Sequence, residues 1–241
     1  MPVNKLNVLK KNRNIKPKTD LSQLFKLIYE KKGFFSLILL TLVIQLYITY
    51  YVSENIDIEK NEDTKTFGFN YKLIAAYVAI FIIILILAFI TMPPWLKFIF
   101  FSIFSFAFGV ILGYKKSLYD PNTIKTAFFG TISIFVSMFA FGVALIASNI
   151  QLGYMFGLGL CFALLFLLII SIVQFFIIQS SFLYKILVIC SLMLFSVYIV
   201  YDTNSILQRD YGGDFISAAL AYYLDIINIF SNLLSISDFD E

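Results

Sequence analysis

The amino-acid sequence predicts an all-α membrane protein, a seven-helix bundle with the last helix at its centre. Of the 241 residues, 60% are hydrophobic and only 14% are charged, whereas soluble domains average about 45–50% apolar and about 25% charged residues. The mean hydropathy is +0.88. Long apolar segments recur along the chain, and the last of them also carries ionisable and amide side chains that lipid does not accommodate.

Each of these segments is close to the length that a transmembrane helix needs, about 20 residues. The segments predicted to be helices are 33–52, 71–91, 95–114, 126–147, 153–178, 182–201 and 214–234. The first six are apolar almost throughout, so we expect each of them to span the membrane.

Turn-forming residues separate the segments. Met92-Pro93-Pro94 ends the second segment and begins the third, because proline disfavours helix at the preceding residue and suits the first helical turn. Asp120-Pro121-Asn122 is a turn signal ahead of the fourth segment. The acidic residues from Glu54 to Asp63 indicate a loop on the non-cytoplasmic side. Lysines after the third segment argue against this orientation, namely Lys115, Lys116 and Lys125.

The seventh segment is amphiphilic. It contains Asp225, Asn228 and Asn232 together with several serines and tyrosines. A helix this polar cannot face lipid on all sides, so we expect the other helices to surround it. The alternative arrangement is six spans and a re-entrant last helix.

The charge is concentrated near the N-terminus. Residues 1–33 hold nine of the 18 basic residues, which predicts a cytoplasmic tail by the positive-inside rule. No apolar run precedes Gly33, so we expect no cleaved signal peptide. We divide the chain into a basic tail over 1–32, a helical membrane domain over 33–234 and a short acidic tail over 235–241. We expect the chain to contact the lipid bilayer and not nucleic acid.

Histidine is absent from the sequence, which removes the commonest general base, metal ligand and pH switch. Cys161 and Cys190 lie in apolar segments, where cysteine is usually a packing residue and not a metal ligand or a disulfide partner. Any response to pH near neutrality must therefore come from carboxylates. We expect neither an enzyme nor a bound cofactor.

Two carboxylates on consecutive segments are the candidate functional residues. Asp202 follows the sixth segment and Asp225 lies in the middle of the seventh. A charge at the bilayer centre costs about 2.5–3.5 kcal/mol on insertion scales, so it is rarely retained without a function. The simpler alternatives are a buried structural carboxyl at Asp225 and an ordinary interfacial residue at Asp202. Together the two suggest a buried pair that handles protons or cations.

If Asp202 and Asp225 meet, desolvation and mutual repulsion make them titrate as one unit. Such a pair can sense pH without histidine, and when ionised it is a hard oxygen site suited to transient calcium binding. Repulsion between the two carboxylates would open the pair as pH rises and increase the calcium flux. Tight binding of calcium by the doubly charged pair would instead slow its release, so the flux could either rise or fall with pH. Four polar residues could support the pair: Tyr201, Tyr222, Asn228 and Asp214.

Three short motifs match a known signature in order and spacing. They are Tyr201-Asp202-Thr203, Ala218-Ala219-Leu220 and Tyr223-Leu224-Asp225-Ile226-Ile227-Asn228, followed by Phe230. This stretch resembles the signature of the transmembrane Bax inhibitor motif family, which includes Golgi anti-apoptotic proteins and their viral relatives. A looser resemblance in the number and length of spans covers most of residues 21–234.

The resemblance implies a seven-helix fold with the last helix central, and a calcium leak gated by an aspartyl pair that carries over to Asp202 and Asp225. In eukaryotic members it implies suppression of cell death through lower stored calcium. We therefore expect a pH-sensitive calcium leak channel of the endoplasmic reticulum or Golgi, or of the plasma membrane in bacteria, with calcium as the permeant ion. Some members carry an arginine in the second span and an acidic residue in the third, but 71–91 and 95–114 here contain neither.

Two alternatives belong to other functional classes. The first is a non-conducting scaffold that binds cell-death or calcium-channel membrane proteins. The second, less favoured, is an intramembrane aspartyl protease, whose first motif Tyr201-Asp202 resembles. Asp225 follows Tyr223-Leu224 and not the Gly-x-Gly of those enzymes, and their Pro-Ala-Leu element is missing because all five prolines precede Val143.

Overall fold

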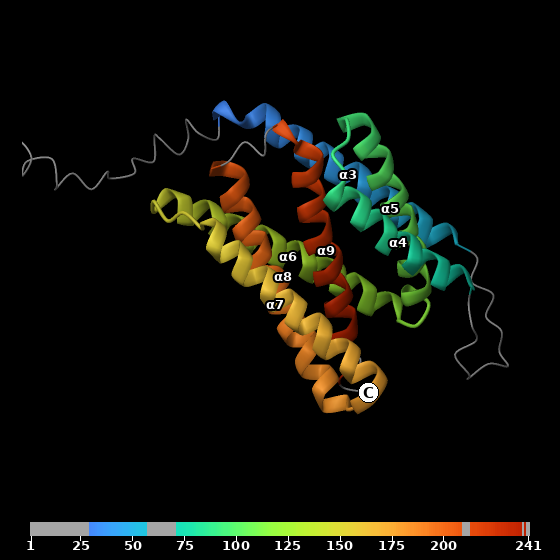
Figure 1. Ribbon diagram of the computed structural model, residues 1–241. Helices are drawn as coiled ribbons and strands as arrows, with labels where there is room; N and C mark the ends of the chain where they lie inside the picture. Colours follow the sequence, from blue (N-terminus) through green and yellow to red (C-terminus); the bar gives the residue numbers. More distant parts are fainter. Residues whose placement is uncertain (1–28, 57–70, 209–212, 238, 240–241) are drawn as a thin grey trace, which may run out of the picture.

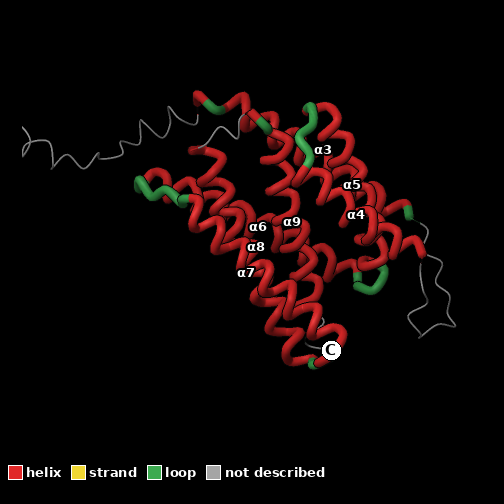
Figure 2. Tube along the Cα trace, viewed as in Figure 1, coloured by secondary structure: helices red, strands yellow, loops and turns green. Residues whose placement is uncertain are grey.

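The computed structural model describes residues 29–56, 71–208, 213–237 and 239. Within these ranges the regular structure is helical (Figure 1), which confirms the predicted fold class. The helices are α3 Lys32–Asn55, α4 Tyr71–Phe89, α5 Pro94–Lys116, α6 Pro121–Ala147, α7 Tyr154–Val173, α8 Ser181–Gln208 and α9 Phe215–Ser237, with a π-helical turn, η1, over Gln174–Ile178. The connections between them that the structure describes are short (Figure 2).

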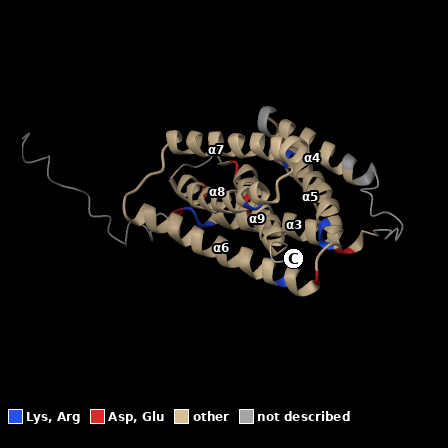
Figure 3. Cartoon of the chain, turned by 90° about the horizontal axis from the view of Figure 1, so that it is seen from below, with Lys and Arg blue, Asp and Glu red and all other residues tan. Residues whose placement is uncertain are grey.

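Six helices among the described residues are long and apolar enough to cross a membrane. They are α3, α5, α6, α7 with its π-helical extension, α8 and α9. The apolar part of α4 covers Ala75–Leu87. Charged residues lie mainly near the ends of the helices (Figure 3), and Asp225 in the middle of α9 is an exception. Several charged segments of the sequence lie outside the described residues, namely the basic residues up to 28, the acidic loop from 57 to 63, Arg209, Asp210 and the acidic residues 238, 240 and 241.

The last helix lies between two groups of helices (Figure 1). On one side α9 packs against α3 and α5, with α4 on α5; on the other side it packs against α8 and α6, with α7 on α8. Half of the residues in the most apolar 18-residue stretch of α9 are buried within the protein. None of the residues in the corresponding stretch of α7 are buried. The central position predicted for the last helix is therefore confirmed.

The largest departures from the predicted boundaries are at the start of one helix and the end of another. The fourth begins at Pro121 and not at 126, because Asp120 caps it: its Oδ2 accepts hydrogen bonds from the backbone N–H groups of Asn122 and Thr123, each at 3.2 Å. A turn signal in the sequence is thus a helix cap followed by proline at the first helical position. The sixth helix, α8, continues past the predicted end at 201 to Gln208.

Glycines bring particular helices into close contact. A Cβ atom added at Gly109 of α5 would lie 2.8 Å from the carbonyl oxygen of Thr49 in α3, and one added at Gly142 of α6 would lie 2.9 Å from that of Val200 in α8. Small residues of this kind let helix backbones approach closely in lipid. The bundle therefore contains two tightly packed helix pairs, α3–α5 and α6–α8, on either side of α9.

A buried carboxyl pair at the candidate functional site

The structure brings Asp202 of α8 and Asp225 of α9 together inside the bundle. Asp202 is 7% exposed and Asp225 is 3% exposed. Their carboxyl groups lie close enough to interact directly, and Asp225 Oδ2 has no hydrogen-bond partner. A hydrogen bond between two carboxyl groups requires a proton on one of them, because a carboxylate only accepts. A pair joined by such a hydrogen bond carries at most one negative charge.

The helical periodicity of α9 explains why Asp225 is buried. Ala218, Tyr222, Asp225 and Ile229 follow one another at spacings of three or four residues, so they share one face of the helix. The three uncharged residues of this face are 0% exposed. Asp202 lies within α8, and the polar residues that follow it are also buried because α6 and α9 pack over them. The helix end predicted from hydropathy, at 201, is therefore too early.

Tyr222 is the predicted supporting residue that contacts α8 beside the pair. Its hydroxyl lies 2.9 Å from Oγ1 of Thr203, the residue after Asp202, and Thr203 in turn donates to the carbonyl oxygen of Ile199 at 2.7 Å. The rings of Phe135 and Phe139 in α6 lie 5.4 and 6.5 Å from the Tyr222 ring. Thr203 was not singled out by sequence analysis, because a hydroxyl next to an aspartate in a helix is a weak signal.

The other three predicted supporting residues make contacts elsewhere. The ring of Tyr201 packs 6.0 Å from that of Phe156 in α7. Asn228 donates from Nδ2 to the carbonyl oxygen of Leu224 in its own helix, at 2.7 Å. Asp214 forms an ion pair with Lys97 of α5.

Asp214 caps the N-terminus of α9. Its Oδ1 accepts from the backbone N–H of Ser217 at 3.0 Å, and its Oδ2 accepts from the Ser217 hydroxyl at 2.8 Å. Lys97 Nζ also donates to the Ser217 hydroxyl, at 2.8 Å. Burial raises the pKa of Asp214, but the hydrogen bonds from Lys97 and Ser217 and the positive charge of Lys97 together hold its pKa below the ordinary value of 3.8. Asp214 therefore stays ionised at neutral pH and anchors α9.

The described residues contain no group of three or more His, Cys, Asp or Glu side chains that could hold a metal ion. Calcium usually takes about six to eight oxygen ligands, of which a carboxyl pair supplies only a part. The donors present are hard oxygen atoms, from Asp202, Asp225 and the hydroxyls of Thr203 and Tyr222. This set alone is too small for a resident calcium site.

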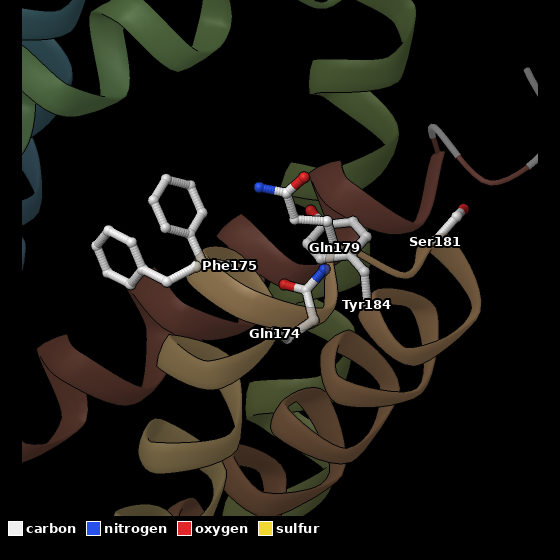
Figure 4. A pocket seen from close by; sticks show the side chains of 6 residues that line it. Gln174, Phe175, Gln179, Ser181 and Tyr184 are labelled. Carbon is white, nitrogen blue, oxygen red and sulfur yellow. The ribbon is translucent and has the colours of Figure 1, made fainter.

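A cavity lies away from the pair, at the turn between α7 and α8. Its volume is about 620 Å³, and Gln174, Gln179 and Tyr184 are among the residues that line it (Figure 4). A smaller cavity of about 280 Å³ adjoins it near Ser191 and Asn232. Neither is lined by Asp202 or Asp225, and about 30 Å of helix separate Ser181 from Asp202 along α8. The carboxyl pair therefore lies outside the lining of both cavities.

Comparison with known proteins places the chain among membrane proteins connected with cell death. The sequence model of the family described as Bax1-I, inhibitor of apoptosis-promoting Bax1, matches residues 31–240. Bax inhibitor 1 of Schizosaccharomyces pombe is 30% identical over 160 residues, which cover 65% of this chain and 58% of that protein. The Golgi anti-apoptotic protein of vaccinia virus strain Lister is 27% identical over 133 residues, 55% of this chain and 54% of that protein. Protein lifeguard 4 of Mus musculus is 30% identical over 120 residues, 49% and 48% of the two chains.

The aligned part of the chain thus spans about half the length of each of these curated relatives. The family match, by contrast, extends from the beginning of α3 through the end of α9, and so includes both Asp202 and Asp225.

Proposed function

Because this chain belongs to the Bax inhibitor family, we propose that it restrains apoptosis as a multi-pass membrane protein that lets calcium leak from an intracellular store. The names of its relatives, Bax inhibitor 1 and Golgi anti-apoptotic protein, support the first part of this proposal. The observation that carries the second part is the buried pair of Asp202 and Asp225, whose carboxyl groups lie close together between two membrane helices. The endoplasmic reticulum or Golgi is the membrane proposed for it.

The pair acts as a gate that a proton holds closed. With a proton shared between the carboxyl groups, α8 and α9 are joined by a hydrogen bond. Loss of that proton leaves two carboxylates in contact, and their repulsion is strong where water is excluded. The helices then separate at this level, and the freed oxygen atoms become ligands for a passing calcium ion. The leak accordingly increases as pH rises through the range in which the pair titrates.

Calcium efflux from proteoliposomes tests this mechanism. The wild type should release calcium at a rate that increases with pH. Asp202→Asn and Asp225→Asn should each lose most of the flux and its pH dependence, because an amide cannot ionise. The double variant should add little to either single variant, since the two residues act as one unit.

The matched control is Asp120→Asn, the same chemical change at the exposed cap of α6. Asparagine caps helices about as well as aspartate, so this variant should conduct like the wild type. Wild-type flux and pH dependence in the double variant would refute the gate. A wild-type protein that suppresses cell death in cells but releases no calcium from liposomes would favour the non-conducting scaffold.

A further inference from the structure

A second buried polar cluster lies on the α3–α5 side of the central helix. Every fourth residue along one face of α3 is polar and buried: Thr41, Gln45, Thr49 and Ser53 are 4, 0, 1 and 7% exposed. Ser105 of α5 and Tyr223 of α9 are both 0% exposed and face the same interface. We call Gln45, Thr49, Ser102, Ser105 and Tyr223 the α3–α5–α9 cluster.

Hydrogen bonds connect three helices through this cluster. Gln45 donates from Nε2 to the Ser102 hydroxyl at 3.1 Å, and Thr49 Oγ1 lies 3.1 Å from the carbonyl oxygen of Ser105. The hydroxyls of Thr49 and Tyr223 form a short hydrogen bond between α3 and α9. The Tyr223 ring is enclosed by three rings of α5, those of Phe101, Phe104 and Phe108, at 5.3, 5.9 and 6.4 Å.

Two polar atoms of the cluster have no partner within the protein. They are Gln45 Oε1 and Ser105 Oγ, and both side chains are completely buried. The Ser105 hydroxyl lies close to the Tyr223 phenol, but Ser105 Oγ makes no hydrogen bond of regular geometry within the protein. Buried polar groups without a partner are rare in native proteins because they lose their hydrogen bonds to water. Two of them in one cluster therefore indicate a ligand that bonds to both kinds of atom, a carbonyl acceptor and a hydroxyl.

The chemistry of the cluster selects a neutral ligand. Its side chains are one carboxamide, three aliphatic hydroxyls and one phenol, so none of them carries a charge that would offset a buried cation. Water both donates and accepts, and buried water typically makes about three hydrogen bonds to otherwise unpaired groups. We propose that the α3–α5–α9 cluster is a binding site for buried water, which hydrogen-bonds to Gln45 Oε1 and Ser105 Oγ.

This water site is separate from the carboxyl pair. Tyr223 and Asp225 are two residues apart on α9, so their side chains point about 200° apart around the helix axis. Tyr223 contacts α3 and α5, whereas Asp225 contacts α8. The central helix thus makes polar contacts with its neighbours on two opposite sides at the same depth. The proposed water site does not depend on whether the protein conducts calcium.

The stability of Ser105→Ala distinguishes a hydrated cluster from a dry one by the sign of the change. If water binds Ser105 Oγ, alanine removes a hydrogen bond and should lower the apparent Tm in detergent by about 2–4 °C. If the cluster is dry, alanine removes an unpaired buried hydroxyl, and Tm should stay the same or rise. Ser133→Ala, on an exposed face of α6, is the matched control and should leave Tm unchanged. An unchanged or raised Tm for Ser105→Ala overturns the proposal.

X-ray radiolytic footprinting tests the water directly. Radicals formed from bound water oxidise neighbouring rings even where bulk solvent does not reach, so wild-type Tyr223 should be oxidised despite 0% exposure. This labelling should resist a radical scavenger in the bulk solvent. It should fall severalfold in Ser105→Ala and further in the double variant with Gln45→Met. An unlabelled Tyr223 in the wild type, or labelling unchanged in Ser105→Ala, contradicts the proposal.

Discussion

Gly142 determines how closely α6 approaches α8 beside the carboxyl pair. A Cβ atom at this position would lie 2.8 Å from Thr203 Cβ and 2.9 Å from the carbonyl oxygen of Val200, and the latter cannot rotate away. Gly142→Ala should therefore force the helices apart and destabilise the protein by about 1–3 kcal/mol, the usual cost of overpacking. Thermal unfolding in detergent measures this loss.

Gly159→Ala is the control for that substitution. Gly159 also lies in a membrane helix, α7, but nothing lies within 4 Å of a Cβ atom added there. Alanine is favoured over glycine in helices, so this variant should be as stable as the wild type or slightly more stable. Equal destabilisation by both substitutions would show that close approach at Gly142 is not the cause.

Among single residues, only the most costly ones can be recognised from the sequence. Asp225 stands out because a carboxyl in an apolar segment needs a partner. Gln45 and Thr49 went unrecognised although they belong to a regular four-residue pattern, since amides and hydroxyls in a span can bond to their own helix. Asn228 donates to the carbonyl oxygen of Leu224 in its own helix, and its support of Asp225 stays a prediction.

At the scale of helices, α5 holds α9 near both of its ends. Near the first turn of α9, Lys97 pairs with Asp214 and Ser217. Near the last turns, Lys115 donates to the carbonyl oxygen of Ser231 and to the Ser235 hydroxyl, at 3.1 and 3.4 Å. A lysine near the C-terminal end of a helix also interacts favourably with the helix dipole. These contacts fix α9 along its axis while its sides pack against α3, α6 and α8.

The Lys97–Asp214 contact should make the start of α9 sensitive to acid. The pKa of Asp214 is held below 3.8 in the folded protein, so its contribution to stability is complete above the pKa of the unfolded chain and is lost as pH falls through the lower, folded value. In hydrogen exchange, wild-type residues 215–219 should be better protected than those of Lys97→Met. This difference should be constant from pH 7 to pH 5 and disappear in stronger acid.

Lys125→Met is the control, because Lys125 is exposed on α6, and it should leave the protection of residues 215–219 unchanged. A Lys97→Met difference that already fades between pH 7 and pH 5 would contradict the assignment to Asp214. The result also separates two effects of pH. A calcium flux that changes between pH 5 and pH 8 then has its origin outside this contact.

Helix boundaries followed from the sequence only where apolar residues end. The second proline of Met92-Pro93-Pro94 does begin α5. The end of α8 was misplaced because Asp202 and the polar residues after it resemble an interfacial segment, although tertiary packing buries them in a continuing helix. Polarity marks a boundary only when the polar side chains reach water, and the sequence of one helix does not reveal what covers it.

At the scale of the whole molecule, hydropathy sufficed for the number of long helices among the described residues, and the polar side chains of the last one predicted its central place. Hydropathy did not reveal which helices pack closely against each other. The close contacts of α3 with α5 and of α6 with α8 depend on Gly109 and Gly142 meeting particular backbone atoms. The meeting of Asp202 with Asp225 was expected partly from the family resemblance, which supplied spatial information that periodicity lacks.

The orientation of the whole bundle can be predicted from the charges at its ends. The ion pair of Lys116 with Glu54 puts the end of α5 and the end of α3 on the same side of the membrane. Nine basic residues precede or begin α3, and by the positive-inside rule they hold the opposite end in the cytosol. The two lysines at the end of α5 oppose this bias, but both contact other groups of the protein. Lys115 donates a hydrogen bond to α9, and Lys116 forms an ion pair with Glu54.

We therefore expect the N-terminal tail in the cytosol and the Glu54–Lys116 end of the bundle in the lumen. A glycosylation acceptor inserted near Glu59 should be modified when the protein is made in the presence of endoplasmic reticulum membranes, and one inserted near Lys11 should not. Modification near Lys11 alone would mean that the lysines at the end of α5 outweigh the N-terminal tail. The orientation would then be inverted, and the Lys97–Asp214 contact would face the calcium store and not the cytosol.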